Sequence, residues 1–154
     1  MKTYILSGCL LLALALAAPV FSQDMGSIAF INDLAAKKEA SYGDAVRLFA
    51  QTAGRKSAGF KADHQFLLDQ KIAWTNSYTE AEPLRRGTLA LMTARYLKLD
   101  DSLMFAIFKI RRYAVAACAA NGIMPPDGGE WDVLSGGELI EVMGIISAKL
   151  EGEQ

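Results

Sequence analysis

Two clusters of basic side chains are the residues of this chain best suited to bind a ligand. They are Arg85 with Arg86, and Lys109 with Arg111 and Arg112. A guanidinium group binds a carboxylate or a phosphate through two parallel hydrogen bonds, so these arginines suit an anionic polymer. The alternative is that they are solvated and pair with acids of the same chain, such as Glu80 and Glu82.

Three aromatic residues, Trp74, Tyr78 and Trp131, lie in or beside predicted loops. An aromatic ring at such a place either stacks on a sugar ring or anchors its loop to the core. Together with the first basic cluster, they give a candidate binding site for a glycan or another polyanion. Its residues are Arg85, Arg86, Tyr78 and Trp131.

The residues that enzymes use do not form a recognisable set. His64 is the single histidine, with Asp63 beside it, and no G-x-S-x-G, H-E-x-x-H or C-x-x-C motif accompanies it. Segment 134–138, Leu-Ser-Gly-Gly-Glu, resembles the signature of ABC ATPases, but the chain lacks a phosphate-binding loop, so a capped helix start is the better interpretation. Segment 127–132 holds three acids without the ligand spacing of a calcium loop. We predict no catalytic residue, no cofactor and no metal site.

Residues 1–22 predict an export signal. Lys2 precedes an apolar run over 10–18, and small residues before Gln23 satisfy the cleavage rule, so the mature chain is expected to begin there. The apolar run is shorter than the roughly 20 residues of a membrane-spanning helix. The alternatives are an earlier cut, an uncleaved anchor, and lipid attachment at Cys9, although the apolar core follows this cysteine instead of preceding it.

The mature protein is therefore expected to be exported, either to the periplasm or to the cell envelope. Residues 23–154 suffice for a single domain. The net charge of −1 gives no global basic field, which argues against nucleic acid and lipid surfaces as partners. Cys118 is the one cysteine beyond the signal, and its alanine-rich surroundings predict a buried thiol.

Three segments share a glycine at a predicted helix start, followed by apolar residues at helical spacing. The glycines are Gly43, Gly87 and Gly137, and their intervals are typical of a repeated supersecondary unit. The apolar residues two and five positions later are Ala45 and Leu48, Leu89 and Met92, and Leu139 and Val142. This spacing predicts three amphipathic helices, with Asp44, Thr88 and Glu138 as first-turn capping residues.

The whole mature chain is predicted to be all-α, with five or six helices. Further helices are expected around 63–74 and over 103–110, the latter continuing or kinking into 113–121. Turn residues predict loops at 54–59, 75–83 and 125–129.

The order of these motifs resembles the S-layer homology (SLH) repeat, a helix-loop-helix unit. The third unit matches its first helix at Ala114-Val115, Cys118 and Gly122-Ile123, its loop at Asp127-Gly128 and Trp131, and its second helix start at Leu134 and Glu138. The middle unit matches at Tyr78 and at 84–87, with Arg86 on the family's arginine. The departures are Tyr42 and Gly136 in place of that arginine, Thr88 in place of a glutamate and Ile110 in place of a tryptophan. The units span 41–54, which is partial, 61–99 and 103–150.

The resemblance implies a non-catalytic module that holds exported proteins on cell-wall polysaccharide through arginine and aromatic side chains in grooves between repeats. We therefore expect an envelope-associated protein for adhesion or scaffolding, whose partner is a cell-wall or envelope polymer. The alternative is a periplasmic accessory subunit that docks an envelope protein complex through a helical face. We expect no nucleic acid as partner and no stable insertion into a membrane after cleavage of the signal.

Overall fold

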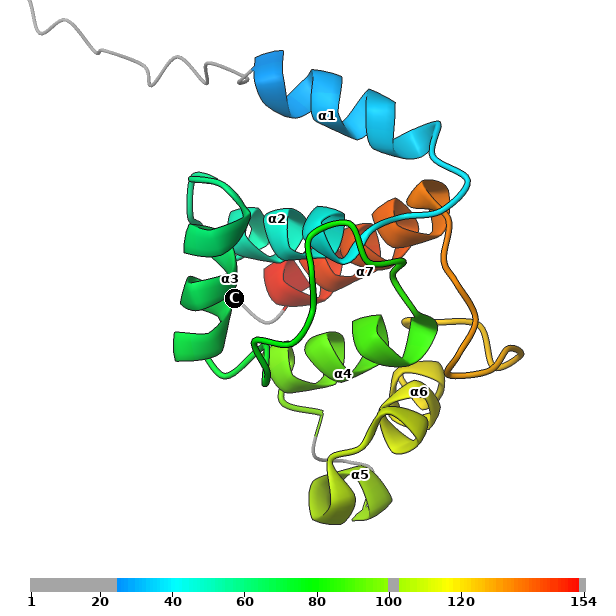
Figure 1. The fold of residues 1–154 in the computed structure, drawn as a ribbon. Helices are drawn as coiled ribbons and strands as arrows, with labels where there is room; N and C mark the ends of the chain where they lie inside the picture. Colours follow the sequence, from blue (N-terminus) through cyan, green and yellow to red (C-terminus); the bar gives the residue numbers. More distant parts are fainter. Residues whose placement is uncertain (1–24, 100–102, 153–154) are drawn as a thin grey trace, which may run out of the picture.

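The computed structural model describes residues 25–99 and 103–152. All regular structure in these ranges is helical apart from two isolated bridges, so the prediction of an all-α chain is confirmed (Figure 1). The helices are α1 (Met25–Ala35), α2 (Tyr42–Thr52), α3 (Phe60–Asp69), α4 (Arg86–Tyr96), α5 (Leu103–Phe108), α6 (Arg111–Ala120) and α7 (Gly136–Gly152). None of them combines the length and the apolar composition that a bilayer-spanning helix needs. The export signal lies outside the described residues.

The described residues form seven helices, where five or six were expected. Helix α1 was not predicted; it packs on α7 through the fully buried Leu34. Helices α5 and α6 are separate because Lys109 adopts a left-handed φ of 47° and Ile110 is extended. Helix α3 ends before the predicted residue 74 because Lys71 also adopts a left-handed φ, of 60°.

The three glycine-led segments begin helices α2, α4 and α7, and their apolar stripe is buried as predicted. The residues two positions after each glycine, Ala45, Leu89 and Leu139, are all 0% exposed. The residues five positions after it, Leu48, Met92 and Val142, are also buried. These faces form the centre of the hydrophobic core.

Two of the three predicted caps are present. The hydroxyl of Ser41 accepts the N–H of Asp44 at 3.2 Å, and the Asp44 carboxylate accepts the N–H of Ser41 at 2.8 Å. Ser135 and Glu138 form the same reciprocal pair at the start of α7. Helix α4 differs, because Arg85 stands at its N-cap and makes no capping hydrogen bond with its side chain.

The residues that precede these three helix starts are joined in a ring of backbone hydrogen bonds. Leu84 donates to the carbonyl of Ala40 at 2.8 Å, Leu134 donates to that of Leu84 at 2.9 Å, and Ala40 donates to that of Leu134 at 2.8 Å. All three residues are buried. Helix starts that are far apart in the sequence therefore meet at one point in the core.

Loop carbonyls also satisfy the first free N–H groups of α2 and α4, and this explains two of the repeated glycines. The N–H of Gly43 donates to Glu80 and that of Gly87 to Glu130, each at 2.9 Å. A Cβ at either position would lie 2.9 Å from that same carbonyl oxygen. At the start of α7 the close approach falls one residue earlier, at Gly136.

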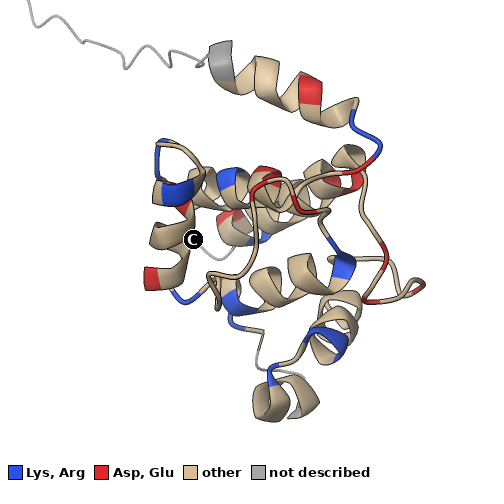
Figure 2. Ribbon diagram, viewed as in Figure 1, with Lys and Arg blue, Asp and Glu red and all other residues tan. Residues whose placement is uncertain are grey.

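Charge is unevenly distributed over the molecule (Figure 2). Helices α4, α5 and α6 contain no acidic residue. In the sequence, residues 83–126 hold seven lysines and arginines against two acids, Asp100 and Asp101, which lie outside the described residues. The net charge of −1 conceals this local excess of positive charge.

Candidate ligand-binding groove

Three of the four predicted binding residues line one groove of about 270 Å³. Tyr78 comes from the loop before α4, Arg85 from the N-cap of α4, and Trp131 from the loop before α7. Arg111, the first residue of α6, also lines the groove. The site is therefore built from the ends of helices and from the loops between them.

The two guanidinium groups of the groove both lie near the Trp131 ring. The guanidinium carbon of Arg111 is 4.9 Å from the centre of the ring, and that of Arg85 is 5.7 Å from it. Arg85 also donates a hydrogen bond to the backbone carbonyl of Trp131 at 2.9 Å. Trp131 is nevertheless 59% exposed, so much of its ring remains accessible from solvent.

Tyr42 lines the groove from a buried position. It is 1% exposed, its ring lies 4.7 Å from that of Tyr78, and its hydroxyl has no hydrogen-bond partner among the described residues. Burial, together with the nearby Tyr78 and Glu82, raises the pKa of Tyr42, so the hydroxyl stays protonated. The hydroxyl oxygen itself is buried, so Tyr42 forms the wall of the groove behind Tyr78.

One acid, Glu82, lines the groove together with Arg85 and Arg111. The ion pairs within 4.0 Å among the described residues are Lys37–Asp44 and Arg55–Asp63. The pairing of the first arginine cluster with Glu80 or Glu82, which the sequence left open, is therefore not formed. The groove carries an excess of positive charge.

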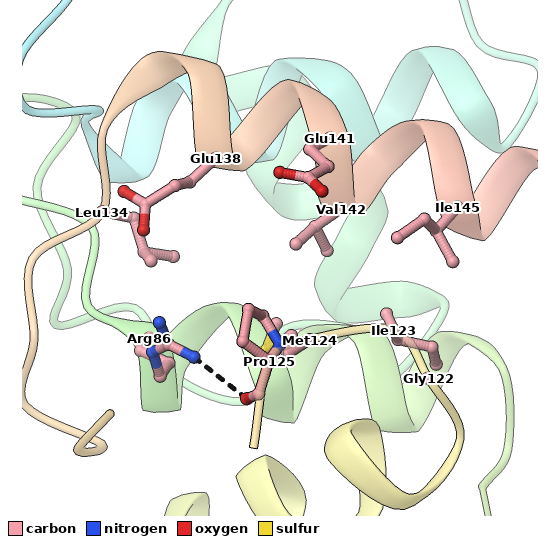
Figure 3. A pocket seen from close by; sticks show the side chains of 10 residues that line it. All are labelled: Arg86, Gly122, Ile123, Met124, Pro125, Leu134, Glu138, Glu141, Val142 and Ile145. Carbon is pink, nitrogen blue, oxygen red and sulfur yellow. Dashed lines mark hydrogen bonds between the residues drawn. The ribbon is translucent and has the colours of Figure 1, made fainter. Parts of the chain in front are cut away.

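Arg86 does not line this groove. It is 8% exposed and faces a separate, largely apolar pocket between the start of α4, segment 122–125 and α7 (Figure 3). Its guanidinium donates to the carbonyl of Pro125 at 3.3 Å and packs against Gly128, where a Cβ would come within 3.0 Å of it. Glu138 faces it from α7 (Figure 3). Hydrogen bonds from Ser135, with the charge of Arg86, lower the pKa of Glu138.

The contacts of Arg86 are thus with the protein itself. They connect the start of α4 to Pro125 and Gly128, in the loop that carries Trp131. Arg85 is the N-cap, with an extended backbone (φ −92°, ψ 145°), whereas Arg86 is the first helical residue, so the two side chains leave the backbone in different directions and face different cavities.

His64 and Asp63 do not act together. The His64 ring is stacked on Phe60, with centres 5.4 Å apart, and meets Tyr42 edge to face. Burial lowers the pKa of His64. A hydrogen bond with the backbone of Thr75 raises it, but by less, so the pKa is lowered overall. The Asp63 carboxylate accepts hydrogen bonds from the loop before α3, from the Ser57 hydroxyl and the Ala58 N–H. The histidine is part of an aromatic cluster in the core.

The predicted buried state of Cys118 is confirmed. Its side chain is 0% exposed, and the thiol donates to the carbonyl of Ala90 at 3.5 Å. Burial raises the pKa of this thiol to about 12.

The sequence missed Tyr42 as a groove residue and did not single out Arg111 within its basic cluster. A signal for Tyr42 was present, because it occupies the place in the first glycine-led segment that Arg86 occupies in the second. Arg111 gave no such signal, since its place depends on the separation of α5 from α6. Searches of protein-family models, curated proteins and solved structures find no match to this chain.

Proposed function

We propose that this protein is an exported, non-catalytic module that binds an acidic polysaccharide of the cell envelope in the groove of Tyr78, Arg85, Arg111 and Trp131. The observation that carries the proposal is the convergence of two guanidinium groups on one exposed indole ring. Its role would be adhesion or scaffolding at the envelope.

Each group of the groove suits a different part of an acidic sugar. Arg85 and Arg111 supply forked donors for a carboxylate or a phosphate. The exposed surface of Trp131 offers an apolar face for a sugar ring.

The supporting residues hold the groove in shape. Arg85 bonds the carbonyl of Trp131, and Arg86 bonds that of Pro125 in the same loop. Arg86 was predicted to contact the ligand, but it does not line the groove, so we assign it as a positioning residue instead. Its loss should move the loop and so weaken binding indirectly.

The ring that joins Ala40, Leu84 and Leu134 supports the repeat interpretation on which the SLH-like resemblance depends. The three residues hold the same place before their helices, and each one bonds the other two. In such an arrangement grooves arise between neighbouring units, as the resemblance implies. The ligand groove lies between the starts of α2 and α4.

Co-sedimentation with insoluble cell-wall sacculi tests the proposal, with sacculi whose acidic polymers have been removed as the comparison. The wild-type protein should sediment with intact sacculi at low salt and be released by high salt, because the contact is partly ionic. The Arg85→Gln/Arg111→Gln variant and Trp131→Ala should stay in the supernatant.

The matched control is Lys38→Gln/Lys61→Gln, which removes the same charge at two exposed positions outside the groove. It should sediment like the wild type. A wild-type protein that remains in the supernatant at low salt would rule out the glycan. Equal losses in both double variants would show that net charge, and not the groove, determines binding.

A further inference from the structure

A second surface, at the end of the molecule formed by α5, is apolar and exposed. Met104, Ile107, Phe108 and Ile110 are between 44% and 62% exposed. They lie within seven consecutive residues, in and directly after a helix that packs against α6. We call these four side chains the apolar tip. Large apolar side chains gathered in this way mark a contact surface.

A basic depression adjoins the apolar tip. Lys71, Arg95, Lys98 and Lys109 line it, together with Phe105 of α5, and none of the described residues that line it is acidic. In Figure 2, blue residues lie in the turn after α3, at the end of α4 and between α5 and α6, and one red residue, Asp69, ends α3. The depression is separate from the ligand groove, with which it shares no lining residue.

Three of these cationic residues have a left-handed backbone conformation, in which glycine is favoured. Lys71, Lys98 and Lys109 follow α3, α4 and α5 with φ of 60°, 51° and 47°. Helices α2 and α6 end on Gly54 and Gly122 in the same left-handed conformation. A side chain with a Cβ is disfavoured there, so the chain keeps a lysine at some cost in stability at all three helix ends that face the depression.

We propose that this end of the molecule docks on a lipid surface with anionic headgroups, the apolar tip entering the boundary of the acyl chains and the basic depression facing the phosphates. An apolar helix bordered by lysine and arginine is the arrangement that binds at a membrane interface without spanning it. Lysines close to an anionic bilayer add electrostatic attraction over a short range. The low net charge of the whole chain does not oppose this, because the charges that face the surface are those of this end alone.

Flotation with lipid vesicles tests the proposal, using the exported protein at low salt. Vesicles of equal parts phosphatidylcholine and phosphatidylglycerol should bind it, and vesicles of phosphatidylcholine alone should bind it much more weakly. Ile107→Ser/Phe108→Ser should weaken binding by at least about tenfold, because both side chains enter the interface. Ile28→Ser, at a position on α1 that is 47% exposed, is the control and should bind like the wild type.

The Lys71→Gly/Lys98→Gly variant distinguishes a role of these lysines in vesicle binding from a role in stabilising the fold. Vesicle affinity should fall roughly tenfold or more with two attractive charges lost. The melting temperature should stay the same or rise, since glycine suits both backbone conformations. A merely structural role of these lysines predicts no change in vesicle binding.

Three outcomes would overturn the proposal. The wild type could fail to bind vesicles that contain phosphatidylglycerol. The serine variant could bind as well as the wild type, which would assign binding to another part of the chain. Light scattering could instead show a dimer that the serine variant abolishes in the absence of any vesicle binding, which would make the apolar tip a protein interface.

Discussion

Gly136 is the position at which the packing of α1 on α7 is most sensitive to a single methyl group. A Cβ built there would lie 1.7 Å from the carbonyl oxygen of Leu34 and 3.1 Å from its side chain. Ordinary contacts begin near 3.4 Å, so about 1.7 Å must be gained by moving the end of α1. The N–H of Gly136 also donates to Lys37 at 3.0 Å, and this bond would be strained by the same movement.

We expect Gly136→Ala to lower the free energy of unfolding by about 1–3 kcal/mol, the range for overpacking at a buried contact. Gly144→Ala, on the same helix, is the matched control, because its Cβ would meet nothing within 4 Å. Removing a glycine from an open helix interior should raise the free energy of unfolding by about 0.5–1 kcal/mol. The two variants should therefore differ by about 1.5–4 kcal/mol.

Urea unfolding followed by far-UV circular dichroism measures both values from the transition midpoint and slope. The alanine could also be accommodated by undocking of α1, which would lower the slope as well as the midpoint because less surface is then buried in the folded state. A Gly136→Ala protein as stable as the wild type would refute the contact between Leu34 and α7.

Four further predictions concern single residues. Leu139→Asp places an unpaired charge at a fully buried position and should cost about 3 kcal/mol or more in urea unfolding; a neutral effect would mean that this face is not in the core. Burial lowers the pKa of His64 from its ordinary 6.5, so the unfolded chain takes up the proton first as the pH falls. The free energy of unfolding should therefore decrease as the pH falls below about 6.5, and His64→Phe should remove this part of the slope; an unchanged slope would contradict it. Cys118, with its pKa near 12, should react with iodoacetamide at about pH 8 only as fast as the chain unfolds, and rapid labelling of the folded protein would argue against its burial. The intact mass of the exported protein should correspond to a chain beginning at Gln23, whereas a lipid-modified or full-length species would show a different kind of signal.

Helical spacing was sufficient to predict the parts of the fold that depend on local sequence. Ala45, Leu89 and Leu139 were identified as core positions because each lies at the same distance from a helix start, and all are fully buried. Asp44 was likewise predicted as a first-turn capping residue, and its partner Ser41 lies within one turn of it.

Features that depend on contacts between distant segments could not be read in this way. The bonds that join residues 40, 84 and 134 carry no side-chain signature, because they are made by the backbone. The sequence grouped Arg85 with Arg86, yet one faces a polar groove and the other an apolar pocket. The excess of positive charge over residues 83–126 was also missed, because the net charge of the chain adds these residues to acidic ones elsewhere.

The backbone hydrogen bonds among Ala40, Leu84 and Leu134 form a closed ring of three residues. In a linear array each repeat contacts only its neighbours, so each end leaves one face without a partner repeat. In this ring the N–H and the carbonyl of each residue are already hydrogen-bonded to the other two residues, so no N–H is left to bond a fourth segment. Deleting any one of the three would leave a buried N–H and a buried carbonyl without partners, each at a cost of about 1–3 kcal/mol. The three helix starts therefore hold one another in place, and none of them can be removed without breaking two of the three bonds.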